Sequence, residues 1–180
     1  LARPVSYLKL TKHNPARQSL AAGSVVAWKR ETIGFDVNGR IEFVMAQGSN
    51  VAGPITDGSG KVVTPGTLVA RLENRRYELA VKESEAAIQD AKARLNRAQA
   101  DYRRQLDVYK KGAGAKSYVD KAEAEFKTAK AQLRAVEAKL RQTQIDAADT
   151  LLFAPFGGLI SRVQANRGAY VERGNPVATI

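Results

Sequence analysis

A heptad-like pattern of apolar and small residues runs from Glu73 to Ala147 and is broken once, at Gly112-Ala113-Gly114. On both sides of the break these residues recur at alternating steps of three and four, the spacing of a coiled-coil seam. Neither arm contains Pro, and both consist mainly of strong helix formers. The pattern predicts two antiparallel helices, each on the order of 50 Å long at about 1.5 Å per residue. The predicted seam comprises Tyr77, Val81, Ser84, Ile88, Ala91, Leu95, Ala98, Tyr102, Gln105 and Tyr109 on the first arm, and Val119, Ala122, Phe126, Ala129, Leu133, Val136, Leu140, Thr143 and Ala147 on the second.

A rod of this length uses a large share of a chain of 180 residues, so no large enzyme core fits beside it. The net charge is +11, from 29 Lys and Arg against 18 Asp and Glu. One interpretation is a basic coiled-coil protein that binds nucleic acid, an anionic membrane or an acidic protein. The other is a solvated coiled-coil surface, because the basic residues are spread along both arms.

Catalytic and metal sites find little support in the sequence. The chain has no Cys, and its single histidine, His13, falls in a predicted loop, which excludes the usual transition-metal sites. Carboxylates on the arms alternate with basic residues, as in Glu78 with Lys82 and Asp90 with Arg94, and this i, i+4 spacing is typical of exposed ion pairs. No glycine-rich phosphate loop opens a helix. We therefore expect a protein that is not an enzyme and holds no cofactor or metal.

The segments on either side of the rod repeat one another. Each is too small to bury a core, so we predict that residues 28–72 and 148–180 combine in one β-sandwich. Its expected core includes Phe35, Ile41, Phe153 and Ile160, and the repeated glycines are expected in tight turns with positive φ. The matched pairs are Thr32-Ile-Gly-Phe35 with Thr150-Leu-Leu-Phe153, Gly39-Arg-Ile41 with Gly158-Leu-Ile160, Val44 with Val163, Gly48-Ser-Asn-Val51 with Gly168-Ala-Tyr-Val171, and Pro65-Gly66-Thr-Leu-Val-Ala-Arg-Leu72 with Arg173-Gly174-Asn-Pro-Val-Ala-Thr-Ile180.

Two segments lie outside the repeat. Between Val51 and Thr64 the first half carries about a dozen extra residues, which we interpret as a longer mobile hairpin in preference to a binding loop. Residues 1–27 show a weak alternation at Val5, Tyr7 and Leu10, then a loop at Thr11–Arg17. A strand-like run follows at Ser24–Lys29.

This order of parts resembles the periplasmic adaptor proteins, also called membrane fusion proteins or the HlyD-like family, of tripartite efflux pumps and type I secretion systems. The resemblance covers residues 32–180 and rests on the two half-motifs that flank a helical hairpin. The matching stretches are Phe35 to Val51, Val63 to Leu72, Leu152-Phe-Ala-Pro-Phe-Gly-Gly-Leu-Ile160, which is similar to the family's Ala-Pro-Phe-Gly signature, and Ala115-Lys-Ser-Tyr-Val-Asp-Lys-Ala122 just after the hairpin tip.

The resemblance implies an α+β fold, with the coiled-coil hairpin (73–147) inserted between two halves (28–72 and 148–180) of a lipoyl/biotinyl-like β-sandwich. Residues 1–27 would be strands of an incomplete β-barrel or membrane-proximal domain. The family bridges an inner-membrane transporter of the RND or ABC type and a TolC-type outer-membrane channel. It assembles into rings, often of six, in the periplasm. Anchoring to the inner membrane would come from a segment outside this chain, and no nucleic-acid partner is expected.

In that family the hairpin tip docks onto the channel through an Arg, a Leu and a Ser at fixed spacing. Arg104 matches the Arg, Val108 stands at the Leu position, and Ala115 stands at the Ser position without its hydroxyl. Lys111 and Ser117 lie nearby and complete the candidate contact set. Carrier domains of the same fold attach their cofactor to a Lys in a tight hairpin, and Lys61 lies in the wrong loop for that role, which argues against covalent attachment.

Overall fold

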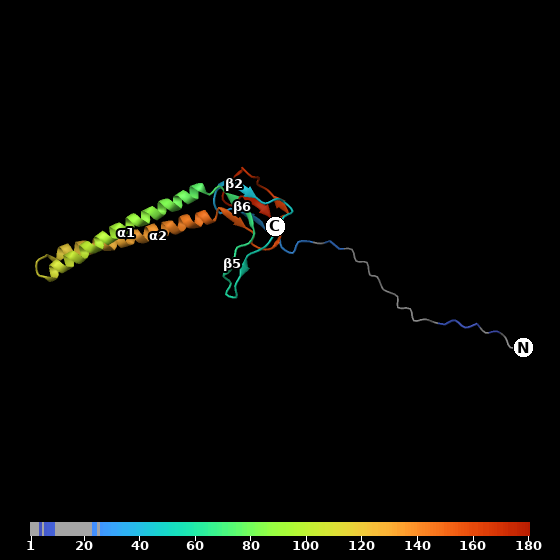
Figure 1. The fold of residues 1–180 in the computed structure, drawn as a ribbon, viewed down its shortest axis with the longest axis horizontal. Coiled ribbons are helices and arrows are strands. Elements are labelled where there is room, and N and C mark those ends of the chain that lie inside the picture. The colour runs from blue at the N-terminus through green and yellow to red at the C-terminus, as the bar shows by residue number, and fades with distance from the viewer. Residues whose placement is uncertain (1–3, 5, 10–22, 25) are drawn as a thin grey trace.

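The computed structural model describes residues 4, 6–9, 23–24 and 26–180, and it consists of a β module at the base of two long helices (Figure 1). The predicted α+β class and helical hairpin are confirmed. In chain order the elements are β1 (Thr32–Gly34), β2 (Gly39–Val44), β3 (Asn50–Val51), β4 (Ile55–Thr56), β5 (Val62–Thr64), β6 (Leu68–Leu72), α1 (Arg75–Lys110), α2 (Lys116–Ala148), β7 (Leu151–Phe153), β8 (Gly158–Leu159), β9 (Arg162–Val163), β10 (Tyr170–Val171) and β11 (Pro176–Thr179).

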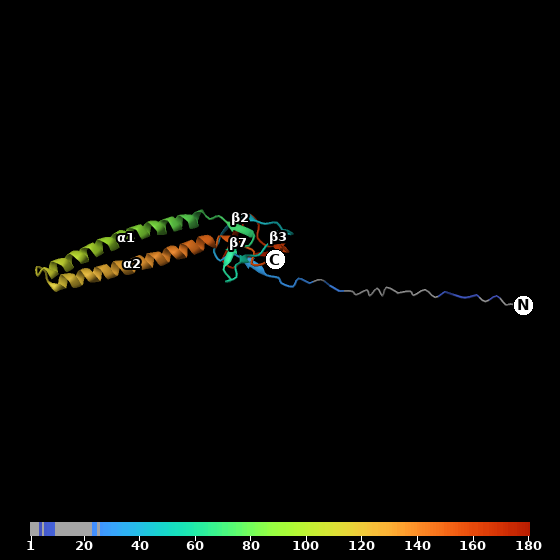
Figure 2. The ribbon, with the colours of Figure 1, turned by 60° about the horizontal axis from the view of Figure 1, so that its bottom comes forward.

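The two helices lie side by side along their length, and their turn is at the end opposite the β module (Figures 1 and 2). The predicted seam is buried or half-buried at nearly every position, and its fully buried members are Ser84, Ile88, Ala91, Val119, Ala122, Ala129 and Thr143. Two predictions need correction. Leu133 is half-buried and not fully buried, because a two-helix rod leaves one side of its longer seam residues open. Tyr109 is 42% exposed, since it lies in the last turn of α1.

Specific contacts fix the pairing of the helices along the seam. Tyr102 and Phe126 stack with ring centroids 6.0 Å apart and an interplanar angle of 6°. Nearer the base, Thr143 Oγ1 donates to Ser84 Oγ at 3.3 Å across the buried interface. Each hydroxyl also donates to a carbonyl of its own helix, Ser84 to Ala80 O and Thr143 to Leu140 O, both at 2.9 Å, so neither buried polar group lacks a partner.

The β module is built by strands from both halves of the chain, as the repeat predicts. The strand order is β10-β2-β6-β7 in the largest sheet and β1-β11-β9 in the next, with β3-β8 and β4-β5 as two-stranded pairs. Every sheet except β4-β5 contains strands from before and after the rod. Neither half therefore forms its sheets without the other.

The backbone hydrogen bonds between the halves are reciprocal. Gly48 N donates to Ile160 O at 2.8 Å, and Gly168 N donates to Ile41 O at 2.8 Å. Exchanging each residue for its repeat partner converts one bond into the other. The strand pairs β3-β8 and β10-β2 are related in the same way. The β module thus has an internal approximate two-fold symmetry.

The symmetry extends to two hydrophobic clusters, each with residues from both halves. The first contains Ile33, Val51, Val69, Ala154, Ile160, Ala178 and Ile180, and the second contains Phe35, Ile41, Ala70, Leu72, Ala165, Val171 and Val177. Equivalent residues occupy the two clusters with two exceptions: Ala165, and Ile33, whose counterpart Leu152 is half-buried against both clusters. The expected core residues Phe35, Ile41 and Ile160 are buried.

The expectation for Phe153 is wrong, because the sequence match was one residue out of register. Thr32 pairs with Thr179 in one sheet. Arg71, the repeat partner of Thr179, pairs with Leu151 in the other sheet, so the counterpart of Thr32 is Leu151 and not Thr150. Gly34 therefore corresponds to Phe153, and Phe35 corresponds to Ala154. Ala154 takes the buried position at 1% exposure, whereas Phe153 is 36% exposed.

The repeated glycines also divide into two groups. Gly48 and Gly168 have φ values of 83° and 86°, so the predicted left-handed turn occurs in both halves. At the next repeated glycine the halves differ. Gly174 has a φ of 78°, whereas a Cβ on Gly66 would lie 2.2 Å from Ala154 O. Gly66 is thus required by close backbone approach.

The remaining predictions concern loops. The extra residues between Val51 and Thr64 form the β4-β5 hairpin, which is exposed throughout. No strand lies among the described residues of Ser24–Lys29, so the strand expected there is wrong for that part. Val5, Leu10, the Thr11–Arg17 loop and His13 lie outside the described residues.

Candidate functional site at the hairpin tip

The tip is a tight turn whose backbone groups are satisfied locally. Gly112 N donates to Tyr109 O at 2.9 Å, and Ala113 N donates to Val108 O at 3.2 Å. With Gly112 at a φ of 76°, this is the Schellman arrangement that ends a helix at a left-handed residue. The turn thus presents the ends of α1 and α2 in a defined geometry.

All five predicted contact residues, Arg104, Val108, Lys111, Ala115 and Ser117, are exposed and lie on the last two turns of α1, the turn, or the start of α2. Arg104 forms an ion pair with Asp101 one turn earlier on α1. Val108 is 38% exposed and packs over Gly114, where an added Cβ would lie 3.1 Å from Val108 Cγ1. Arg104 and Val108 are four residues apart and share a face of α1.

Ala115 is the N-cap residue of α2, with φ −81° and ψ 141° and no side-chain cap. A hydroxyl at this position would accept a hydrogen bond from the first turn of the helix and stabilise it by about 1 kcal/mol. A Ser at this position would therefore cap α2, which Ala115 does not do. Ser117 lies within the first turn of α2, where its side chain cannot take the N-cap role.

Two exposed aromatic residues lie near the turn: sequence reasoning did not name Tyr118, and it placed Tyr109 in the seam. Tyr118 is 62% exposed at the start of α2, and Tyr109 is 42% exposed at the end of α1. For Tyr118 the signal was present, because it breaks the three-and-four spacing one residue before Val119. Exposed aromatic side chains are enriched at protein-binding surfaces.

The surroundings of the tip are basic. Exposed Arg103, Lys110, Lys111 and Lys116 surround the turn. The carboxylates nearest the turn are Asp107 on α1 and Asp120 on α2, and the four basic residues outnumber them. The tip can therefore attract an acidic surface and place two tyrosines and a valine against it.

The opposite end of the rod is fastened to the β module. Tyr77 Oη donates to Asn38 O at 2.6 Å, and Asn38 Nδ2 donates to Tyr170 Oη at 2.8 Å. Burial is the main cause of a raised pKa of the Tyr77 hydroxyl, so the phenol stays protonated and can keep this donor role. Contacts from both halves thus set the direction in which the rod leaves the module.

Within residues 4, 6–9, 23–24 and 26–180, no group of three or more His, Cys, Asp or Glu side chains is arranged to hold a metal ion. Lys61 lies exposed on the β4-β5 hairpin. Neither long helix is apolar enough along its length to cross a membrane.

Comparison with known proteins gives a match in structure but not in sequence. No family model and no curated protein matches the chain. Among solved structures, the membrane fusion protein Spr0693 from Streptococcus pneumoniae R6 is similar, with a TM-score of 0.63 and 13% identity over 86% of this chain and 59% of that one. ZneB from Cupriavidus metallidurans has a TM-score of 0.53 and 15% identity over 84% of this chain and 43% of that one. The periplasmic adaptor protein EmrA has a TM-score of 0.51 and 13% identity over 86% of this chain and 72% of that one.

The similarity covers the hairpin and the β module together, which is the combination that the resemblance in sequence implied. At these identities it concerns the fold, and the chain spans about half the length of the first two proteins. The chain has the fold of the membrane fusion proteins, the periplasmic adaptors.

Proposed function

We propose that this chain is the hairpin and base of a periplasmic adaptor that links an inner-membrane transporter, of the RND or ABC type, to a TolC-type outer-membrane channel. The observation that carries the proposal is the separation of a basic, partly apolar tip from the β module by the full length of a two-helix rod (Figure 1). A rod fastened at one end and exposed at the other is suited to joining two partners that lie far apart.

In this proposal the tip contacts the channel. Arg104 supplies a polar contact, because a guanidinium donates several hydrogen bonds in a fixed fork. It would exchange its intrahelical partner Asp101 for an acceptor on the channel. Val108 and Tyr118 supply apolar contact area, and Lys111 steers the tip toward an acidic rim. The contribution of Ala115 is limited to the backbone.

The β module would be the lipoyl-like part of the adaptor, and copies of it would lie side by side in a ring, which the resemblance implies to be one of six. The domains that adaptors carry beyond this module, and the anchor to the inner membrane, would belong to segments outside residues 28–180. The protein would act as a non-enzymatic link without a cofactor. The fold gives no support to the other interpretation, a basic coiled coil that binds nucleic acid or an anionic membrane.

The test is the double substitution Arg104→Asp with Val108→Asp in the full-length protein. It places two carboxylates on the tip while leaving the seam unchanged. We expect loss of export activity and of cross-linking to the channel, with the helical melting curve preserved.

The matched control is Arg141→Asp with Ile145→Asp. This pair has the same i, i+4 spacing on the exposed surface of α2, and Ile145 is 48% exposed, but it lies at the base of the rod. Export should survive in the control. If the tip variant exports and cross-links normally while folded, the tip does not dock.

A further inference from the structure

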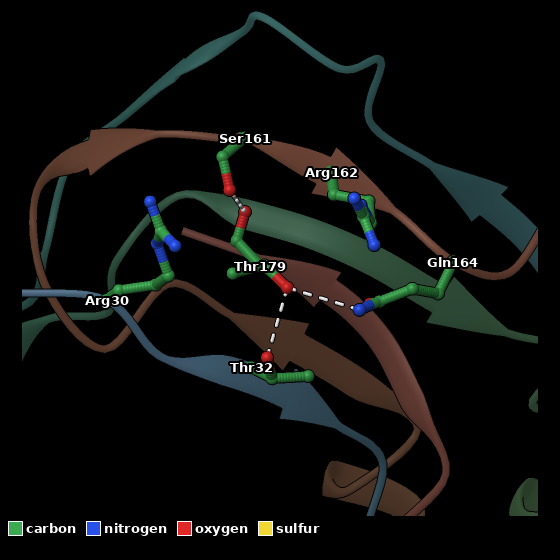
Figure 3. Close-up of a pocket in the computed structure, with 6 residues that line it drawn as sticks. All are labelled: Arg30, Thr32, Ser161, Arg162, Gln164 and Thr179. Carbon is green, nitrogen blue, oxygen red and sulfur yellow. Dashed lines mark hydrogen bonds between the residues drawn. The ribbon is translucent and has the colours of Figure 1, made fainter. Parts of the chain in front are cut away.

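A polar cavity of about 460 Å³ lies on the outer face of the three-stranded sheet β1-β11-β9 (Figure 3). Side chains alternate between the two faces of a strand. Ile33 and Ala178 point into the core, so their neighbours in sequence, Thr32 and Thr179, lie on the other face. The cavity is lined by Arg30, Thr32, Ser161, Arg162, Gln164 and Thr179.

Two guanidinium groups flank this cavity, and none of the described residues that line it carries a carboxylate. Figure 3 shows Arg30 on one side of Thr179 and Arg162 on the other. Within the part of the chain that the structure describes, neither arginine forms an ion pair, and nearby Glu31 pairs with Lys29 at 3.7 Å. Two arginines without carboxylate partners leave a positive potential in a concave site.

The floor of the cavity offers a hydroxyl proton as well. Gln164 Nε2 donates to Thr179 Oγ1 at 3.2 Å, and Thr179 Oγ1 lies 3.0 Å from Thr32 Oγ1. The two hydroxyls have two protons and share one hydrogen bond. Whichever oxygen donates in that bond, the other hydroxyl keeps a proton for a ligand.

The internal repeat provides a comparison at the equivalent place. The cross-strand row Thr32–Thr179–Arg162 corresponds to Leu151–Arg71–Phe43 in the largest sheet. There Arg71 is satisfied by Glu42, with Nε and Nη2 donating to the two carboxylate oxygens at 3.0 and 3.2 Å. The fold is thus compatible with a satisfied arginine and apolar neighbours at these positions. At these equivalent positions, the arginine of the largest sheet has a carboxylate partner, whereas no ion pair is found for Arg162 in the β1-β11-β9 sheet among the described residues.

We propose that the Arg30–Arg162 cavity is a binding site for a phosphate group. An arginine fork pairs with two phosphate oxygens at once, and two such forks together with a hydroxyl donor fit a group with several acceptor oxygens. The same chemistry is presented by free inorganic phosphate and by the headgroup of an anionic phospholipid.

The experiment uses the 180-residue chain with ¹⁵N-labelled arginine. Arginine Nε–H resonances are followed while inorganic phosphate is added, against sodium chloride at the same ionic strength. We expect saturable shifts of the Arg30 and Arg162 resonances with phosphate and not with chloride. Arg30→Gln and Arg162→Gln should each weaken binding about tenfold, as expected for loss of a charge-assisted contact.

The matched control is Arg167→Gln, which removes the same charge from an exposed turn outside the cavity and should bind phosphate as the unmodified chain does. Thermal melting of each variant establishes that it is folded, and the unmodified chain itself supplies a readout that needs no variant. Equal shifts of all arginines, or unchanged phosphate affinity in the folded Arg30→Gln, Arg162→Gln double variant, would overturn the proposal.

A second arm identifies the source of the phosphate group. Flotation with phosphatidylglycerol vesicles that is competed by inorganic phosphate, and lost in the double variant but kept in Arg167→Gln, assigns the site to a lipid headgroup. Phosphate binding without flotation assigns it to a free solute. Absence of both overturns the site. None of these outcomes depends on docking at the tip, so the site and the proposed function are tested separately.

Discussion

The two hydrophobic clusters of the β module are built at equivalent positions but filled differently. One has Phe35 buried with the smaller Val37 beside it, and the other has Ala154 buried with the larger Phe156 beside it. The buried aromatic ring of one half is thus replaced, in the other, by a half-buried ring two residues further along the chain. The repeat therefore keeps the backbone pairing, while the position of the largest side chain differs between the halves.

The largest expected effect tests this difference directly. Phe35→Ala should lower the free energy of unfolding by about 3–5 kcal/mol, because it opens a cavity at a site that is 1% exposed. Phe153→Ala removes the same atoms from a half-exposed position and should cost under about 1 kcal/mol. Urea denaturation of both variants measures the difference. Similar losses would mean that the two aromatics occupy equivalent sites after all.

The difference in side-chain volume can be measured by a double-mutant cycle in the first cluster, which contains Ala154 and Phe156. Ala154→Phe alone should destabilise by about 1–3 kcal/mol through overpacking. Adding Phe156→Val makes room for the new ring and should recover part of that loss, with a coupling energy of about 1 kcal/mol. Denaturant unfolding of the four proteins gives the coupling. Strictly additive effects would show that the two positions do not share one space.

Gly66 and Gly174 occupy equivalent backbone positions, but a side chain is disfavoured at each for a different physical reason. Gly66→Ala should cost about 1–3 kcal/mol, because its Cβ would meet Ala154 O at 2.2 Å and the sheet would have to shift. Gly174→Ala meets nothing within 4 Å and should cost only about 1 kcal/mol, for its left-handed φ of 78°. Thermal unfolding compares them, and the reverse order would contradict the assignment.

The smallest effect concerns Asp149, whose counterpart in the other half is Arg30. Burial first, and then the charges of Asp36 and Asp146, raise the pKa of Asp149 above the ordinary 3.8. A carboxyl with a raised pKa holds its proton longer in the folded state, so its contribution to stability is full below pH 3.8 and declines as pH rises through the raised pKa. Asp149→Asn should remove this decline in unfolding experiments from about pH 3 to 7. An exposed control, Asp120→Asn, should keep it.

The rod could be predicted from the sequence because it follows a local pattern, and the pairing of the halves could be predicted because their sequences repeat. Heptad spacing depends only on neighbours along one helix, and the repeat fixes which strands meet. The register of Phe153 could not be read in this way. Thr150-Leu-Leu-Phe153 matches Thr32-Ile-Gly-Phe35 in letters, while the hydrogen bonds align the chains one residue later.

The cavity beside Arg30 was also beyond sequence reasoning. Its two arginines are separated by the entire rod and meet only when β1, β11 and β9 join. At the tip, Tyr109 is exposed in the last turn of α1 even though it fits the heptad spacing. The heptad pattern of one helix predicts which of its faces contacts the other helix. It does not predict how completely that single helix buries each residue of the face.

The reciprocal strand exchange has a consequence for the order of folding. Each half completes the sheets of the other. The β module therefore cannot form until the start of α1 and the end of α2 come together. Closing that loop as an unstructured chain would be slow and entropically unfavourable. A helical hairpin forms from contacts that begin near its turn, and once formed it holds both ends within reach of one another. The rod thereby acts as a template for the module, and equal additions to both arms would lengthen it without altering the closure that the module requires.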